Sequence, residues 1–269
     1  MKPLTKALRV APGSKIKLSK IDPADTHGID KEDATDLLTK NIERLSVLQY
    51  QLYAEGRRAL LVVLQGIDAA GKDGSIRHVM SGLNPQGVTV TPFKEPEGPE
   101  KRHDYLWRVH AAVPEWGKIG IFNRSHYEDV LIVRVHGLVP KSVWSQRYEQ
   151  INCFEQMLAK SGTRIVKLLL YIDKDEQARR FQERLDDPSK NWKFSAADVK
   201  EREYWDQYID AYEAVLRKCS TEWAPWYIVP ANRKWFRNLA VSQIVLDALE
   251  EMDLKFPKPA ADLKAIHFE

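Results

Sequence analysis

The feature that most constrains this chain is a continuous apolar run that leads directly into a glycine-rich loop. Residues 59–65 have the sequence ALLVVLQ, and residues 66–74 have the sequence GIDAAGKDG. An uninterrupted apolar run of this length is typical of a strand that is buried on both faces of a parallel sheet. The segment after the loop, SIRHVMSGL, has a helical pattern. Strand, loop and helix in this order predict an α/β fold with an anion site where the strand ends.

The loop contains the spacing G-x-x-x-x-G-K, formed by Gly66, Gly71 and Lys72. Glycines at these positions let backbone N–H groups converge on phosphate oxygens, and the lysine adds a positive charge. The alternative, an ordinary strand-to-helix turn, gives no reason for the further glycine at position 74. We therefore predict a phosphate-binding loop that consists of Gly66, Ala69, Ala70, Gly71, Lys72, Asp73 and Gly74.

The residue after the lysine departs from the common pattern, in which a Ser or Thr hydroxyl binds magnesium. Here that residue is Asp73, so a metal ion needs another ligand. A carboxylate that faces a phosphate chain is repelled by it unless a divalent cation lies between them. Asp68, inside the loop, is therefore the first candidate for a Mg²⁺ ligand, with Mn²⁺ as the alternative ion. The competing interpretation makes Asp68 a turn residue, and we expect Asp73 to act as a helix N-terminal charge.

The rest of the chain alternates apolar strand patterns with helical patterns. Further strands are expected at residues 87–93, 118–122, 164–172 and 225–230, and helices at about 35–55, 75–83, 99–113, 140–160 and 233–252. This alternation predicts a five-stranded parallel sheet covered on both faces, a three-layer α/β/α fold. We expect a single domain over residues 1–269, with an N-terminal extended arm at 1–32, an interrupted helical region at about 173–217 and a C-terminal tail at 253–269.

A second polar segment, FNRSHYEDV, covers residues 122–130 at the end of the third predicted strand. Since ligands of open α/β sheets bind where the strands end, Asn123 and Arg124 should lie beside the phosphate loop. An arginine there can grip a phosphate and neutralise charge on the group in transfer. Glu128 and Asp129 could bind a metal ion, or they could be surface charges at a helix start. Arg134 could reach the phosphates or pair with either acid.

The interrupted helical region carries a group of cations, Arg179, Arg180, Arg184 and Lys193. A mobile helical flap above a phosphate loop could bring such cations onto a polyanion and exclude water. Acidic residues are interspersed among them, so the alternative is a solvated helix face that is crossed by salt bridges.

Composition argues against several other functions. The chain has 41 basic and 38 acidic residues, and its net charge of +3 is too small to predict binding to duplex nucleic acid. No apolar run reaches membrane-spanning length and no secretion signal is recognisable, so we expect a cytoplasmic protein. The histidines form no compact zinc pattern. Cys153 and Cys219 lack metal-site spacing and are expected to stay reduced.

Four separated segments resemble the signature blocks of the family-2 polyphosphate kinases. They are GIDAAGKDG, FNRSHYEDVLIVRV, NWKFSAADVKEREYWDQYIDAYEAVL and APWYIVPANRKW, within a match that runs from about residue 35 to residue 250. The resemblance implies a P-loop kinase fold similar to thymidylate kinase, with a helical lid. It also implies a magnesium-dependent, reversible transfer of the terminal phosphate of polyphosphate to AMP or ADP, by an enzyme that forms dimers or tetramers.

By the same resemblance, Asp68 and Lys72 correspond to the essential acidic and lysine residues of the phosphate loop, and Arg124 corresponds to the arginine of the second motif. Many members have Asp where this chain has Asn123, and members with the NRSHYED sequence suggest that Glu128 supplies the missing charge. This variant resembles the subgroup that accepts both AMP and ADP. The lid cations Arg179, Arg180, Arg184 and Lys193 would line the path of the polyphosphate.

The expected reaction is a direct in-line transfer in which positioning and charge neutralisation carry the catalysis. The nucleotide's terminal phosphate oxygen is already ionised, so no protein base is needed. Two rivals are an ATP-dependent nucleotide or small-molecule kinase on the same fold and a non-enzymatic polyanion-binding protein. The missing Ser or Thr after Lys72 argues against a third, a regulatory nucleotide-hydrolysing switch.

Overall fold

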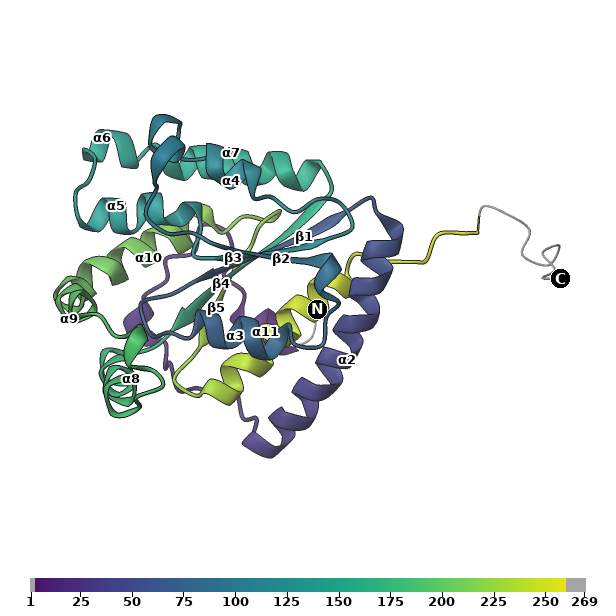
Figure 1. Ribbon diagram of the computed structural model, residues 1–269, viewed down its shortest axis with the longest axis horizontal. Helices are drawn as coiled ribbons and strands as arrows, with labels where there is room; N and C mark the ends of the chain where they lie inside the picture. Colours follow the sequence, from purple (N-terminus) through teal and green to yellow (C-terminus); the bar gives the residue numbers. More distant parts are fainter. Residues whose placement is uncertain (1–2, 260–269) are drawn as a thin grey trace.

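The computed structural model describes residues 3–259, which are built around a five-stranded parallel sheet (Figure 1). The strands are β1 Ala59–Gln65, β2 Val88–Pro92, β3 Ile119–Asn123, β4 Thr163–Tyr171 and β5 Trp226–Pro230. They lie in the order β2-β3-β1-β4-β5, and each neighbouring pair is parallel. Because β3 lies on one side of β1 and β4 on the other, the winding direction reverses at β1. In such sheets the ligand site lies at the carboxyl end of the strands at this switch point.

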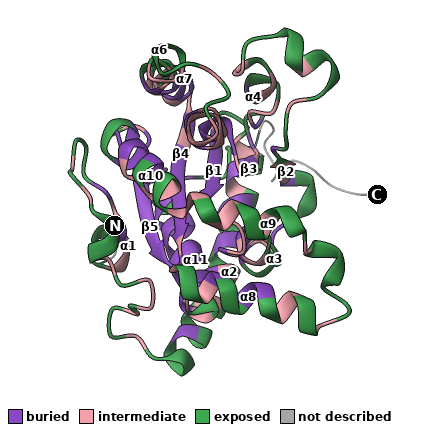
Figure 2. Cartoon of the chain, turned by 90° about the vertical axis from the view of Figure 1, so that its left-hand side faces the viewer, coloured by how far each residue is buried: buried purple, intermediate pink, exposed green. Residues whose placement is uncertain are grey.

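Helices cover both faces of the sheet, which explains why β1 is apolar at successive positions (Figure 2). Leu60, Val62 and Leu64 belong to the core cluster of α2 Lys31–Glu55, α3 Lys72–Val79 and α11 Lys234–Glu250. Leu61 and Val63 belong to the opposite cluster, with α7 Arg147–Lys160 and α10 Trp205–Cys219. Successive side chains of a strand point to opposite faces, so each face of β1 contributes to a separate core. The predicted three-layer α/β/α fold is confirmed.

The α11 helix is the most deeply buried helix near the site. Every residue from Phe236 to Leu249 is buried. The helix contacts α2 on one side and α3, the helix of the phosphate loop, on the other. Polar side chains on α11 therefore lie inside the protein. The polar side chains in its first turns lie beside the phosphate loop.

The predicted N-terminal arm is only partly extended. Residues Pro3–Leu8 form the helix α1, and Leu18–Lys20 form a 3-10 turn, η1. Between them, Arg9 pairs antiparallel with Tyr227 of β5, and the Val10 N–H donates to the Trp226 carbonyl oxygen at 2.9 Å. The extended prediction is therefore wrong for residues 3–8, and the segment covers the free edge of β5. Residues 1–2 of the predicted arm and 260–269 of the predicted tail lie outside the described residues.

Apart from α8, the remaining elements are short. They are η2 Pro85–Gly87, η3 Gly98–Arg102, α4 Trp107–Ala111, η4 His126–Val130, α5 Ile132–Val135, α6 Lys141–Trp144, α8 Lys174–Asp186, η5 Asn191–Lys193, α9 Ala196–Glu201 and η6 Arg202–Tyr204. The single helix predicted over 99–113 is wrong, because the Asp104 carboxylate accepts from the Leu106 N–H at 2.9 Å in a local turn that separates η3 from α4. None of the helices formed by the described residues is long and apolar enough to cross a membrane.

The predicted lid region, 173–217, divides into two parts. Ala211, Tyr212 and Val215 of α10 are buried against the sheet, so α10 belongs to the α/β body. The helices α8 and α9 and the segment between them project beside the phosphate loop (Figure 1). Only this first part can serve as a lid.

Candidate functional site

The phosphate loop connects β1 to α3 through an unusual backbone conformation. Gly66, Ala69 and Gly71 have φ angles of 155°, 66° and 105°. A Cβ atom on Gly66 would lie 2.7 Å from the Leu170 carbonyl oxygen, and one on Gly71 would lie 1.9 Å from Nη1 of Arg237. Gly66 is therefore required by close approach to backbone as well as by φ, and Gly71 is required by its φ angle. Ala69 carries a side chain in the same left-handed region, so other contacts must hold it there.

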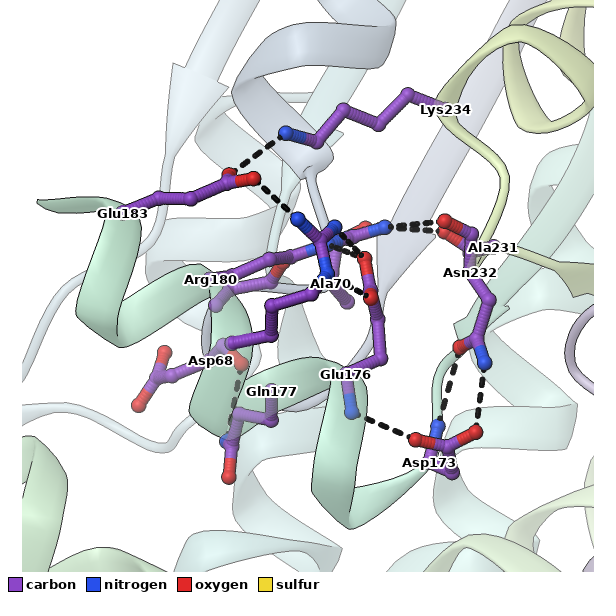
Figure 3. A network of polar contacts seen from close by, with 12 residues as sticks. Asp68, Ala70, Asp173, Glu176, Gln177, Arg180, Glu183, Ala231, Asn232 and Lys234 are labelled. Atoms are coloured by element: carbon purple, nitrogen blue, oxygen red, sulfur yellow. Dashed lines mark hydrogen bonds and ion pairs between the residues drawn. The ribbon is translucent and has the colours of Figure 1, made fainter.

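Arg180 of α8 supplies those contacts (Figure 3). Its Nη1 donates to the carbonyl oxygens of Ala69 and Ala70 at 2.8 and 2.9 Å, and its Nε donates to Oε1 of Glu176 at 2.6 Å. Its Nη2 donates to the carbonyl oxygens of Ala231 and Asn232, which follow β5. Arg180 borders the cleft of the phosphate loop, but all three of its nitrogens bind protein oxygens. In this structure it supports the loop and offers no free donor to a phosphate chain.

Two further contacts tie the start of α8 to the body. Gln177 donates from Nε2 to the Asp68 carbonyl oxygen at 3.0 Å. Asp173, the N-cap of α8, accepts at Oδ2 from Nδ2 of Asn232 at 2.6 Å (Figure 3). The first turns of α8 are therefore fixed against the loop, and the part of the lid that is free to move begins after them.

Three charged side chains meet inside the loop. Lys72 is buried, and its Nζ donates to the Gly66 carbonyl oxygen at 2.7 Å. Asp68 Oδ1 pairs with Nη2 of Arg124 at 2.8 Å. Burial opposes ionisation of Asp68, but the positive charges of Lys72 and Arg124 outweigh it, so the pKa of this carboxyl lies below its ordinary value. Burial also lowers the pKa of Lys72, an effect that Asp68 opposes. Asp68 is consequently an ionised carboxylate at neutral pH.

The second polar segment lies directly beside the loop because β3 pairs with β1. Arg124 has a φ angle of 62°, and its N–H donates to the Leu64 carbonyl oxygen at 3.0 Å. Its neighbour Asn123 donates from Nδ2 to Oδ1 of Asp73 at 2.7 Å. A positive φ in a residue other than glycine is uncommon and often marks functional positions. Here it turns the arginine out of the strand at the switch point.

The acids and the arginine farther along this segment make different contacts. Glu128 borders a small pocket of about 240 Å³ that it shares with Asp68. Burial raises the pKa of Glu128, against the nearby positive charges of Arg124 and Lys72. Asp129 instead pairs with Arg147 at 2.8 Å.

Arg134 does not reach the phosphate loop. Its Nη1 donates to the Tyr148 hydroxyl at 3.1 Å, and its guanidinium lies 5.0 Å from the ring centre of Trp144. The prediction that Arg134 contacts the phosphates or pairs with Glu128 or Asp129 is therefore wrong, because α5 turns the side chain toward α6 and α7.

The phosphate-loop cleft has a volume of about 680 Å³ and is strongly cationic. Arg184 and Lys193 line it. Nη1 of Arg184 lies 3.6 Å from Oδ2 of Asp198, and Nζ of Lys193 lies 3.9 Å from Oδ2 of Asp73. Among the described residues, nine cationic and three acidic side chains line this cleft. They are Lys72, Lys94, Arg124, Arg180, Arg184, Lys190, Lys193, Lys234 and Arg237, against Asp68, Asp73 and Glu183. Such an excess of positive charge suits a polyanionic ligand.

A second cleft, which we call the side cleft, has a volume of about 1240 Å³ and a different lining. Aromatic and apolar side chains such as Phe93, Tyr105 and Ile132 contribute to it, together with Arg108 and Arg147. The guanidinium of Arg147 lies 4.7 Å from the ring centre of Tyr105. Phe93, Lys94 and Arg124 line both clefts, so the two meet at these side chains.

Asp68 and Glu128 are chemically suited to hold a magnesium ion. The described residues contain no group of three or more metal-binding side chains. Magnesium usually takes one or two carboxylates and completes its shell with water and substrate phosphate oxygens. Asp68 and Glu128, two of the four carboxylates on this small pocket with Asp198 and Glu201, lie beside the cationic cleft and fit that requirement.

Sequence reasoning missed the contribution of α11, which brings Lys234, Arg237 and Asn238 to the phosphate-loop cleft. Arg237 is the most informative of them, since it is charged yet lies in a helix that is buried on all sides. A charged residue directly after Trp235 and Phe236 and shortly before an apolar stretch is the signal that could have identified it.

Comparison with known proteins decides the family. Residues 28–257 match the family model Polyphosphate kinase 2 (PPK2). This range contains both polar segments and α11. The chain belongs to the polyphosphate kinase 2 family. The earlier resemblance, drawn from four sequence segments, is confirmed.

Relatives of known name and structure in this family are similar over nearly the whole chain. An AMP/ADP-polyphosphate phosphotransferase from Meiothermus ruber is 50% identical over 98% of this chain and 100% of its own length. An ADP-polyphosphate phosphotransferase from Rhodopseudomonas palustris is 50% identical, over 96% of this chain and 94% of its own. The crystal structure of polyphosphate kinase 2 from Arthrobacter aurescens superposes with a TM-score of 0.95 at 48% identity, covering 98% of this chain and 95% of that chain.

Proposed function

We propose that this protein transfers the terminal phosphate of inorganic polyphosphate to AMP and to ADP, in a reversible, magnesium-dependent reaction. The observation that carries the proposal is the pair of unlike clefts that meet at Arg124. The names of the relatives from Meiothermus ruber and Rhodopseudomonas palustris, which mention AMP, ADP and polyphosphate, support it.

The phosphate-loop cleft is the proposed polyphosphate site. Its lining is dominated by lysine and arginine. Among the described residues, Phe93 and His78 are the two that bring an aromatic ring to this lining. A polyphosphate chain has negative charge along its whole length and no apolar part, so it matches such a lining. Arg184 and Lys193, on the lid side of the cleft, would close on the chain when the last turn of α8 and the segment after it move.

The side cleft is the proposed nucleotide site. A nucleoside needs flat apolar surface for its base and polar groups for its sugar and phosphate. Phe93 and Tyr105 offer rings, and Arg108 and Arg147 lie against those rings at 5.4 and 4.7 Å from their centres. The terminal phosphate of a nucleotide in this cleft would then approach Arg124 from the side opposite the polyphosphate.

In this arrangement the protein positions two phosphates and neutralises charge, and no side chain needs to remove a proton. The attacking oxygen on AMP or ADP is already ionised near neutral pH. Lys72 and the backbone N–H groups of the loop would hold the transferred phosphate, and Arg124 would bind it where donor and acceptor meet. A magnesium ion held by Asp68 and Glu128 would add neutralisation of phosphate charge when bound.

A cytoplasmic location, where these nucleotides are found, and a homodimer or homotetramer form part of the proposal. Support for an oligomer comes from apolar side chains that α2 exposes, namely Leu37, Val47, Tyr50 and Tyr53. Neither nucleic acid nor a membrane is expected as a partner.

The test supplies polyphosphate and either AMP or ADP, with no ATP, and measures ATP by a luciferase readout. Wild-type protein should form ATP from ADP, and from AMP through ADP. Arg124→Gln should lower the rate by about 10² or more, as loss of a donor at the reacting group does. Arg134→Gln, a change in the same segment but outside both clefts, should stay within a few-fold of wild type. No ATP from polyphosphate, with activity when ATP is the donor, would favour an ATP-dependent kinase instead.

A further inference from the structure

Arg237 lies in the first turns of α11 and is only 3% exposed. Its guanidinium approaches the phosphate loop closely. A Cβ atom on Gly71 would lie 1.9 Å from its Nη1, and a Cβ atom on Gly74 would lie 3.0 Å from its Nη2. The guanidinium therefore lies directly against the loop at these two glycines. The second glycine, at position 74, lies just after the G-x-x-x-x-G-K spacing, and a side chain there would crowd Nη2 of Arg237.

This buried cation has no acidic partner. Its Nε and Nη2 both donate to Oδ1 of the neighbouring Asn238, at 3.2 and 2.8 Å. No carboxylate of residues 3–259 forms an ion pair with it, and Nη1 makes no hydrogen bond to them. The nearest influential charge is a second cation, Arg180. Burial, together with Arg180, lowers the pKa of Arg237 to about 10, so it still carries its charge at neutral pH.

An arrangement of this kind costs stability in the absence of a counter-ion. A buried charge is ordinarily paired, because leaving it unpaired in the interior is expensive. The other buried arginine near the loop, Arg180, has Glu176 as its partner. Arg237 instead lines the phosphate-loop cleft, where an anion can reach it.

We propose that Arg237 is a phosphate-binding residue, and that its missing counter-ion is a phosphate group of the polyphosphate bound in the phosphate-loop cleft. This inference rests on the proposed function and deepens it. Nη1, the free donor beside Gly71, makes the contact. Through Arg237, the buried helix α11 forms one wall of the polyphosphate site, opposite the cations of the lid.

The experiment compares wild type with Arg237→Gln and Arg237→Lys, and uses Arg233→Gln as the matched control. Arg233 is exposed, lies one turn earlier and does not line the phosphate-loop cleft. Arg237→Gln should raise the KM for polyphosphate about 10- to 100-fold, as loss of a charge-assisted hydrogen bond does, and should leave the KM for ADP within about threefold. Arg237→Lys keeps the positive charge, so its KM for polyphosphate should lie between those of wild type and Arg237→Gln. The control should match wild type.

A second readout separates binding from a structural role. Because Arg237 is an uncompensated buried charge, Arg237→Gln should leave the melting temperature of the ligand-free protein unchanged or raise it. The stabilisation that inorganic tripolyphosphate gives to wild type should shrink in the same variant. A large fall in the ligand-free melting temperature with an unchanged KM for polyphosphate would overturn the inference.

The outcomes also distinguish this inference from the proposed function. A rise in the KM for ADP alone would assign the phosphate to the nucleotide and overturn the polyphosphate assignment. If wild type formed no ATP from polyphosphate, the proposed function would fail. The tripolyphosphate melting shift would still test phosphate binding by Arg237, because it does not depend on turnover.

Discussion

Two neighbouring arginines of α8 allow a sharp comparison between a buried and an exposed ion pair. Arg179 and Arg180 both pair with Glu176, but the Arg179 side chain is 53% exposed and the Arg180 side chain is 5% exposed. Arg180→Ala would leave the Glu176 carboxylate with exposed Arg179 as its one cationic partner among the described residues. It would also remove the donors to the carbonyl oxygens of Ala69 and Ala70 in the phosphate loop.

The expected losses differ several-fold. Leaving a buried acceptor without its donor costs about 1–3 kcal/mol, so loss of the four carbonyl contacts of Arg180 should cost at least about 3 kcal/mol and lower the melting temperature of a domain of this size by about 6 °C or more. Arg179 has two surface pairs, with Glu176 and Glu183, so Arg179→Ala should cost about 0–1 kcal/mol and less than about 4 °C.

The two variants should also differ in activity. Without Arg180 nothing else among the described residues holds the Ala69 carbonyl, and Ala69 has a φ angle of 66° that favours relaxation. Arg180→Ala should therefore lower kcat well below wild type, while Arg179→Ala should retain it. Thermal unfolding at one protein concentration and the ATP-forming assay give both quantities. Melting shifts within about 2 °C of each other would refute the claim that Arg180 holds the loop.

Three more predictions follow from the same geometry. Asp68→Asn removes an ionised ligand, so it should lower kcat about 10²-fold and raise the Mg²⁺ concentration needed for half-maximal rate. An unchanged Mg²⁺ titration would show that Asp68 does not belong to the metal site. Lys167→Met should cost about 3–5 kcal/mol in urea unfolding because buried Glu155, 2.5 Å from Nζ, loses its lysine partner and keeps only the contacts of His126 and Tyr127. Adding Glu155→Gln should recover part of that loss, and a double variant no more stable than the single one would contradict this. Iodoacetamide should modify exposed Cys153 in the native protein but Cys219 only after unfolding. Burial raises the pKa of the Cys219 thiol to about 12 and keeps it protonated at pH 8. Labelling of Cys219 in the native protein, detected by mass spectrometry, would contradict this prediction.

The sheet and the loop could be predicted from sequence because their signals are local. The run at 59–65 is apolar without alternation, as a strand covered on both faces requires, and β1 has those bounds. The rule that ligands bind where parallel strands end also brought Asn123 and Arg124 to the loop, and hydrogen bonds to Asp73 and Asp68 now join them to it.

What could not be predicted depends on contacts between distant segments. The sequence around Arg180 indicates a cationic helix face, but only the folded chain brings the carbonyl oxygens of residues 69–70 and 231–232 around its guanidinium. Arg237 belongs to α11, and its closeness to Gly71 follows from the packing of α11 on α3. Arg134 lies in a helix of four residues, too short for a pattern to indicate which way it faces.

The central claim assigns polyphosphate to the phosphate-loop cleft and the nucleotide to the side cleft. A crystal structure with Mg²⁺, ADP and a methylene-bridged triphosphate would test it most directly. The account predicts the triphosphate against the backbone N–H groups of residues 71–74, with Arg237 in contact, and ADP beside Tyr105 with its terminal phosphate at Arg124. ADP bound through its phosphates in the loop, with the triphosphate elsewhere, would contradict it.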